Sequence, residues 1–82
     1  MMFYVYMLKG VNSKITKTYV GYTNNLKLRL KKHNSGTGAK STRGYKWKII
    51  YKKRFYDKRL AMSFEYKLKK DFKKRRHLLS IS

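Results

Sequence analysis

The sequence predicts a small α+β domain in which helices flank a three-stranded antiparallel sheet. The length of 82 residues suits one domain, which we expect to span residues 1–82. The hydrophobic share of 41% and the aromatic share of 16% are too high for a disordered basic tail and can supply a core. Three short β-rich runs alternate with helical patterns. The predicted order of elements is therefore β-β-α-β-α-α.

The first two strands are predicted at Phe3–Leu8 and Thr18–Thr23, because both runs are short and rich in aromatic and β-branched residues. The connection between them contains residues that favour turns: Gly10, Asn12 and Ser13. Two strands this close in the sequence are expected to pair as an antiparallel hairpin.

The first helix is predicted in NLKLRLKKHN, from Asn25 to about Asn34. Its candidate N-cap residues are Thr23, Asn24 and Asn25. A glycine-containing loop, Ser35–Lys46, then leads into a third β-rich run at Trp47–Tyr56. The aromatic residues of such a strand either pack in the core or stack on exposed bases, and core packing is the more common role.

The second helix is predicted at Asp57–Lys70, with Asp57 as its N-cap. Its apolar face is expected to hold Leu60, Ala61, Phe64 and Leu68. The remaining residues, 71–82, form a tail in which a short third helix is predicted.

Arg29 and His33 lie one helical turn apart, at the border of the apolar stripe formed by Leu26 and Leu30. This edge of the first helix is expected to flank the sheet. Taken alone, the pair is also compatible with a cationic patch on a solvated helix surface.

The charge of the chain indicates a polyanionic partner. Lys and Arg number 23 against 3 acidic residues, which gives a formal net charge of +20. Nucleic acid is the strongest candidate, because each phosphate contact releases condensed counterions. An anionic membrane fits less well, since the charge runs along the whole chain and not along one amphipathic helix.

Other protein classes are disfavoured by composition. The chain has no Cys, and therefore no disulfide framework and no thiolate zinc site. No apolar run approaches the roughly 20 residues needed to span a bilayer. We expect an intracellular protein, cytoplasmic or nucleoid-associated in a bacterium, and nuclear or in a viral factory in a eukaryote or virus.

Glu65 is the one glutamate, and the other acids, Asp57 and Asp71, are expected near helix ends. Three uses are open for its carboxylate: an ion pair with Lys69, a solvated position on the helix surface, or a ligand for a hard cation. An exposed ion pair would contribute only about 0–1 kcal/mol.

Taken together, these positions resemble the GIY-YIG nuclease family. The two family tripeptides match Tyr4–Tyr6 and Tyr19–Gly21, and the arginine and histidine of the following helix match Arg29 and His33. The acidic metal ligand on the next helix matches Glu65. The resemblance covers residues 3–70 and implies the family's fold and nuclease activity.

Three segments, TYVGYT, HNSGTGAKSTRG and FEYKLK, are similar to the small stand-alone GIY-YIG proteins of bacteria and viruses. They are also similar to the nuclease half of the Slx-type structure-specific endonucleases. Those endonucleases carry a Cys/His zinc module, so a chain without Cys fits the stand-alone kind better. Two departures, Tyr4 in place of glycine and Tyr22 in place of a frequent lysine, concern the substrate and the rate more than the fold.

The resemblance implies five catalytic residues. Glu65 would hold one Mg²⁺ (or Mn²⁺) with several waters. Arg29 would clamp the non-bridging phosphate oxygens. Tyr19 would be the general base, acting as a phenolate that neighbouring cations favour. Tyr6 or His33 would position water or relay a proton.

Several basic residues are candidate contacts to nucleic acid. The glycines of the Ser35–Lys46 loop allow close approach to phosphate, although a merely solvated basic loop remains the alternative. The candidates on the first helix and in this loop are Lys27, Lys31, Lys32, Lys40, Arg43 and Lys46.

The sequence therefore predicts a Mg²⁺-dependent DNA endonuclease. Because the targeting domains of homing and repair members are absent, we expect it to select DNA structure and not sequence; RNA stays open as a substrate. The alternative is a catalytically inactive nucleic-acid-binding module with the same fold. A structural role beside a protein partner, in a larger repair or viral complex, is a third possibility.

Overall fold

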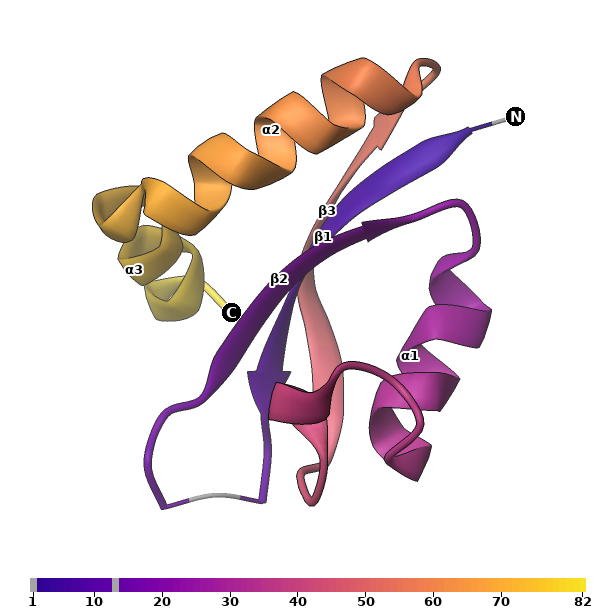
Figure 1. Cartoon of the computed structure of the whole chain (residues 1–82). Helices are drawn as coiled ribbons and strands as arrows, with labels where there is room; N and C mark the ends of the chain where they lie inside the picture. Colours follow the sequence, from indigo (N-terminus) through magenta and orange to yellow (C-terminus); the bar gives the residue numbers. More distant parts are fainter. Residues whose placement is uncertain (1, 13) are drawn as a thin grey trace.

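The computed structural model describes residues 2–12 and 14–82 and contains the elements in the predicted order (Figure 1). The strands form one antiparallel sheet of order β2-β1-β3, which confirms the α+β class. The elements are β1 (Phe3–Gly10), β2 (Thr18–Thr23), α1 (Leu26–Ser35), the short 3-10 helix η1 (Lys40–Thr42), β3 (Trp47–Phe55), α2 (Lys58–Lys70) and α3 (Phe72–Ser80).

The sheet is the middle of three layers: α1 covers part of one face, and α2 and α3 cover the other (Figure 1). The central strand β1 supplies both cores, because successive side chains of a strand point to opposite faces. Val5 and Met7 pack towards α2 and α3, whereas Tyr6 and Leu8 pack on the α1 side with Trp47. The structure thus confirms Trp47 as a core residue, only 5% exposed.

Each α-helix begins at a side chain that accepts a backbone hydrogen bond. Of the three candidates before α1, Asn25 is the cap and accepts from Leu28 N at 3.1 Å. Asp57 caps α2, as predicted, and accepts from Arg59 N at 2.7 Å. Asp71 caps α3. Two of the three acidic side chains are therefore occupied by helix capping.

A β-bulge divides β3 into two halves. The register pairs Leu8 with Ile49 but Met7 with Tyr51, so that Ile50 is an extra residue on β3. Beyond the bulge the alternation is inverted. Lys52 consequently pairs with Tyr6 and shares its face of the sheet, and Arg54 lies opposite Tyr4 on that same face.

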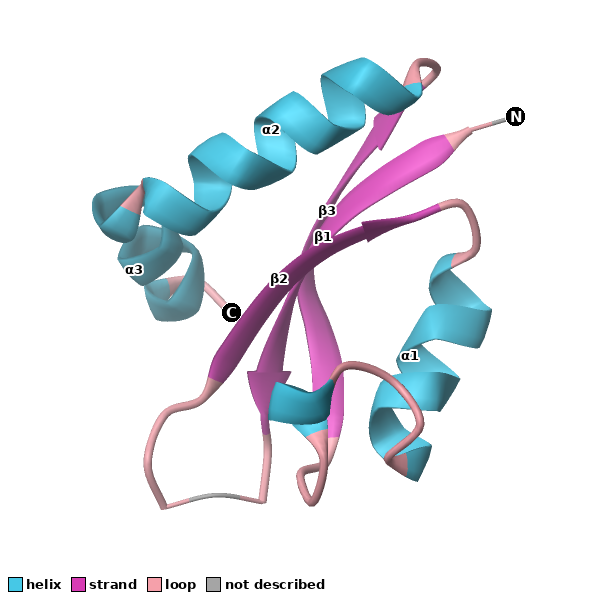
Figure 2. Cartoon of the chain, viewed as in Figure 1, coloured by secondary structure: helices cyan, strands magenta, loops and turns pink. Residues whose placement is uncertain are grey.

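The β1–β2 connection and the loop before β3 lie at the same end of the sheet (Figure 2). The Asn12 side chain accepts from Lys46 N at 2.9 Å, and Val11 N donates to Lys46 O at the same distance. The turn expected at Gly10 and Asn12 is thus anchored to the neighbouring loop. Ser13, the third predicted turn residue, lies outside the described residues.

Some predicted boundaries and faces differ from the structure. β1 continues to Gly10, and β3 ends at Phe55, one residue before the predicted end. Leu60 was expected on the apolar face of α2 but is 59% exposed. The reason is geometric: Ala61 and Leu68 face the sheet, and the residue before Ala61 is turned by about 100° from that line.

The two leucines of α2 provide a direct test of this packing. Leu68→Ala should lower the free energy of unfolding by about 2–5 kcal/mol, because Leu68 is 2% exposed and a cavity would remain. Leu60→Ala should change it by no more than about 0.5 kcal/mol. Urea denaturation followed by circular dichroism measures both. Equal losses in the two variants would contradict the observed orientation of α2.

Candidate active site

Tyr6 crosses over the edge strand β2 because residue 21 has no side chain. Tyr6 pairs with Gly21, and a Cβ atom at Gly21 would lie 2.6 Å from the Tyr6 hydroxyl oxygen and 3.0 Å from Cε2 of Tyr19. Real Cβ atoms do not come within 2.6 Å of a non-bonded atom, so a larger residue would displace the Tyr6 ring and crowd the Tyr19 ring. The glycine of the second tripeptide therefore makes room for the two tyrosines.

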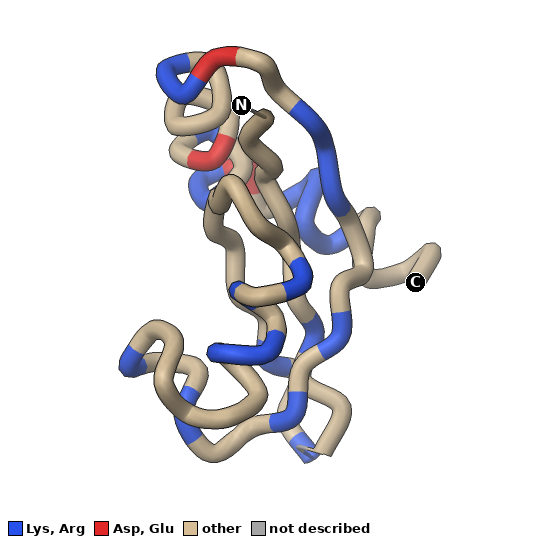
Figure 3. Tube along the Cα trace, turned by 90° about the vertical axis from the view of Figure 1, so that its right-hand side faces the viewer, with Lys and Arg blue, Asp and Glu red and all other residues tan. Residues whose placement is uncertain are grey.

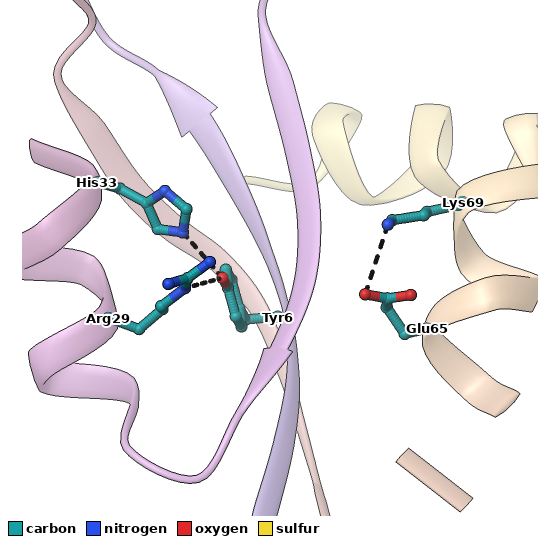
Figure 4. A network of polar contacts seen from close by, with 5 residues as sticks. All are labelled: Tyr6, Arg29, His33, Glu65 and Lys69. Atoms are coloured by element: carbon teal, nitrogen blue, oxygen red, sulfur yellow. Dashed lines mark hydrogen bonds and ion pairs between the residues drawn. The ribbon is translucent and has the colours of Figure 1, made fainter. Parts of the chain in front are cut away.

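Four of the five predicted catalytic side chains come together on the α1 side of the sheet. The Tyr6 hydroxyl bonds to His33 Nε2 at 2.8 Å and accepts from Arg29 Nε at 3.4 Å (Figure 4). The Tyr19 ring lies 4.9 Å from the His33 ring and 6.3 Å from the Tyr6 ring, between centroids. β1, β2 and α1 each contribute to this cluster.

His33 is a buried residue, so a solvated surface position is wrong for it. Its side chain is fully buried, and Tyr6 is 1% exposed. The loop after α1 covers the ring: Thr42 Oγ1 lies 3.0 Å from Nδ1, and a Cβ atom at Gly38 would lie 2.7 Å from Nδ1. The loop expected to contact nucleic acid thus also closes the site. Thr42 was not among the predicted site residues, since one threonine in a polar loop carries no distinguishing pattern.

Burial controls the charge state of the cluster. It raises the pKa of the Tyr6 phenol, although the hydrogen bond from Arg29 acts in the opposite direction. Burial, reinforced by the Arg29 charge, lowers the pKa of His33. Hydrogen bonding to the Tyr6 hydroxyl, with a weaker contribution from Tyr19, raises the pKa of Arg29. At neutral pH the cluster therefore combines a neutral histidine and a neutral Tyr6 with a permanent cation.

Glu65 does not join this cluster. It projects from α2, and in Figure 4 the β2 ribbon passes between it and the side chains of Tyr6, Arg29 and His33. Its carboxylate forms an ion pair of 3.5 Å with Lys69, and its side chain is 16% exposed. The Glu65 charge nevertheless reaches Tyr6, where it is the weakest of the effects that raise the pKa of the phenol.

The side chains present suit a metal that substrate helps to hold. Within residues 2–12 and 14–82, no group of three or more His, Cys, Asp or Glu side chains could form an all-protein metal cage. One carboxylate with waters and a substrate phosphate is, however, the arrangement that Mg²⁺ prefers. Glu65 fits that donor set, provided that Lys69 releases it.

All six predicted nucleic-acid contacts are exposed. Lys32 lines a hollow of ≈ 130 Å³ together with Arg29, so one of the six adjoins the cluster. Figure 3 shows lysine and arginine positions spread along the trace, with the acidic positions gathered in its upper part. No helix within the described residues is long and apolar enough to cross a bilayer.

The structure has a second basic surface beside the cluster, which the sequence pattern did not predict. Tyr4, Lys52 and Arg54 line an open hollow of ≈ 420 Å³ on the α1 side of the sheet. Lys52 lies directly opposite Tyr6 in the register. If the side chains of β3 alternated regularly from Trp47, Lys52 and Arg54 would lie on the other face of the sheet. Only the bulge brings them to the α1 side, and the sequence does not show the bulge.

Comparison with known proteins identifies the family. A family model described as the GIY-YIG catalytic domain matches residues 2–78. The chain belongs to the GIY-YIG family. Membership indicates a nuclease domain, with DNA as the expected class of substrate, and GIY-YIG nucleases generally use a divalent metal.

Several relatives of this GIY-YIG chain are UPF0213 proteins. One from Clostridium perfringens is 50% identical over 68 residues, which cover 82% of this chain and 70% of the relative. Another, from Oceanobacillus iheyensis, is 45% identical over 67 residues, covering 80% and 74%. The solution NMR structure of a UPF0213 protein from Bacillus halodurans superposes with a TM-score of 0.55 at 38% identity, covering 100% of this chain and 86% of that one. These similarities confirm the resemblance found in the sequence and the fold.

The lowered pKa of His33 predicts how stability depends on pH. In the unfolded chain the pKa of His33 returns to its ordinary value of 6.5. Below that pH the unfolded state therefore binds a proton that the folded state does not bind. The free energy of unfolding should be constant from pH 8 to about 7 and should fall as the pH drops towards 5. Urea denaturation at each pH measures it.

Two variants isolate this effect. His33→Gln should flatten the dependence between pH 7 and 5, whereas His77→Gln, at an exposed position on α3, should retain it. An unchanged slope in His33→Gln would show that His33 is not held neutral in the folded protein.

Proposed function

We propose that this GIY-YIG chain is a divalent-metal-dependent endonuclease that hydrolyses DNA phosphodiester bonds and selects DNA structure over sequence. The main support is the hydrogen-bonded cluster of Tyr6, Arg29 and His33, with Tyr19 packed against it. A permanent cation held beside two phenols is suited to a phosphate that gains charge during hydrolysis.

Arg29 would bind the scissile phosphate. Its Nε atom is engaged by the Tyr6 hydroxyl, which leaves the terminal nitrogens of the guanidinium for the non-bridging oxygens. The side chain is half-buried, so its orientation is set before substrate arrives. Such preorganisation favours the transition state over the ground state.

Tyr19 is the better candidate for the general base. It is half-buried and can reach solvent, whereas Tyr6 and His33 are shielded from it. Tyr6 would then act by holding Arg29, and His33 by holding both tyrosines. In this scheme Tyr19, as phenolate, takes the proton from the attacking water.

Glu65 would complete the site from the opposite side of β2. A bound Mg²⁺ or Mn²⁺ supplies a Lewis acid for the leaving oxygen. Because β2 is an edge strand, a phosphate at its edge can be approached by Arg29 from one face and by Glu65 from the other. Lys69 would turn from the carboxylate towards the DNA phosphates.

The hollow at Tyr4, Lys52 and Arg54 supports selection of structure. Two cations beside Tyr6 can follow a phosphate backbone, and such contacts carry no sequence information. Tyr4, which pairs with Arg54, offers a ring on which an unpaired base can stack. We therefore favour branched or partly single-stranded DNA as the substrate.

Glu65→Gln tests the catalytic proposal. The variant should lose at least about 99% of its Mg²⁺-dependent nicking activity, because the metal loses its charged protein ligand. DNA binding should be equal or tighter, since a negative charge beside the phosphates is removed. The measurements are nicking of supercoiled, flap and junction DNA across a Mg²⁺ titration, with matched single-stranded DNA and RNA, and fluorescence anisotropy for binding.

Asp57→Asn and Asp71→Asn are matched controls, because an asparagine at either position can still cap its helix. Both should retain most activity. Loss of nicking in an Asp variant with normal nicking by Glu65→Gln would place the metal elsewhere. Failure of wild-type protein to cleave any substrate, with binding intact, would favour the catalytically inactive binding module.

The double variant Lys52→Ala/Arg54→Ala tests whether the DNA backbone runs through this hollow. Loss of two phosphate contacts should reduce the slope of log K against log salt by about 2. The control is Lys73→Ala/Arg76→Ala on α3, on the opposite face of the sheet, which should leave the slope within about 0.5 of wild type. Affinity for one flap substrate between 50 and 200 mM salt measures the slope. Equal reductions in both double variants would indicate diffuse binding without a path beside Tyr6.

A further inference from the structure

Thr42 is a fully buried polar residue within a basic surface loop. Its hydroxyl oxygen lies 3.0 Å from His33 Nδ1 and 2.7 Å from the carbonyl oxygen of Ala39. The Trp47 indole donates to the Thr42 carbonyl at 2.9 Å, and Asn34 bonds to the backbone of Trp47 at 2.6 and 3.2 Å. The loop, α1 and β3 thus hold the hydroxyl in place against the histidine ring.

These contacts determine which nitrogen of His33 carries the proton. Two oxygens 2.7 Å apart need a hydrogen between them, and the Ala39 carbonyl has none to give. The Thr42 hydroxyl therefore donates to Ala39 and can only accept from His33 Nδ1. A neutral His33 protonated at Nδ1 has a bare Nε2, which accepts from the Tyr6 hydroxyl.

The donor-to-acceptor direction of this series of hydrogen bonds also affects Arg29. When the Tyr6 hydrogen points to His33, the lone pairs of the Tyr6 oxygen remain available to accept from Arg29 Nε. In the other tautomer, Nε2–H and Arg29 would both donate to Tyr6. The Tyr6 hydrogen would then lack its acceptor on His33 in a site that is 1% exposed.

We propose that Thr42 is a positioning residue that selects the Nδ1-protonated tautomer of His33 and thereby orients the Tyr6 hydroxyl to accept from Arg29. Its importance for catalysis rests on the proposed function, whereas the tautomer itself does not. Thr42 acts through His33 and Tyr6, without touching substrate. The proposal assigns a specific task to the loop that covers the cluster.

NMR of protein labelled with ¹⁵N in histidine and arginine measures the chain of bonds directly. In wild type, two-bond correlations should show His33 protonated at Nδ1, and the Arg29 Nε–H signal should be slow to exchange with water. Thr42→Val, which has nearly the same shape but no hydroxyl, should lose the single tautomer and speed exchange at Arg29. Thr42→Ser should restore both. Thr37→Val, at an exposed threonine of the same loop, should leave both unchanged.

Kinetics test the consequence for cleavage. Thr42→Val should lower kcat by roughly tenfold, which corresponds to about 1.4 kcal/mol, with KM changed less than twofold, and Thr42→Ser should recover most of it. Wild-type His33 protonated at Nε2 would overturn the proposal, and so would an unchanged tautomer in Thr42→Val. If Thr42→Val loses the single tautomer as expected but keeps the wild-type kcat, Thr42 has no role in catalysis.

The outcomes separate this inference from the nuclease proposal. If wild type cleaves nothing, the proposed function fails, but the tautomer and the Arg29 exchange rate still decide the role of Thr42. If Thr42→Val does not fold, the wild-type tautomer and the Thr42→Ser spectrum decide it.

Discussion

The hydrogen bond between Tyr6 and His33 joins the central strand to α1 in a layer from which water is excluded. A buried polar pair is tolerated when every donor finds an acceptor, and here the chain of bonds runs on to the Ala39 carbonyl. The pair also requires space. Gly21 and Gly38 provide it, because a Cβ atom at either position would collide with the tyrosine or the histidine.

This arrangement makes the position of Arg29 a product of folding. A guanidinium on an exposed helix would sample many rotamers, whereas the hydrogen bond to Tyr6 restrains this one. Fixed donors are more effective in catalysis than mobile ones, because no reorganisation is needed as charge develops. Glu65 is held differently, by an ion pair with Lys69, whose side chain is 50% exposed.

A net charge of +20 on 82 residues opposes compaction through self-repulsion. Part of the cost is offset where long cationic side chains lie over aromatic rings, as Lys70 does over Tyr66 at 4.4 Å and Lys53 over Phe64 at 4.9 Å. Most of the charge remains at the surface, available to a polyanion. Binding to DNA should therefore also relieve repulsion within the protein.

The sequence by itself determined the order of the strands and helices and the cap of α2, because turn residues, β-rich runs and capping side chains are local signals. It also identified Tyr6, Tyr19, Arg29, His33 and Glu65 as the residues to examine, through their motifs and order. The tertiary structure decided that His33 is buried and that Thr42 fixes its surroundings, since both depend on a loop folding back over α1. It also decided the face of Lys52 and Arg54, because a one-residue bulge inverts the alternation of β3 and such a bulge forms only when β3 pairs with β1.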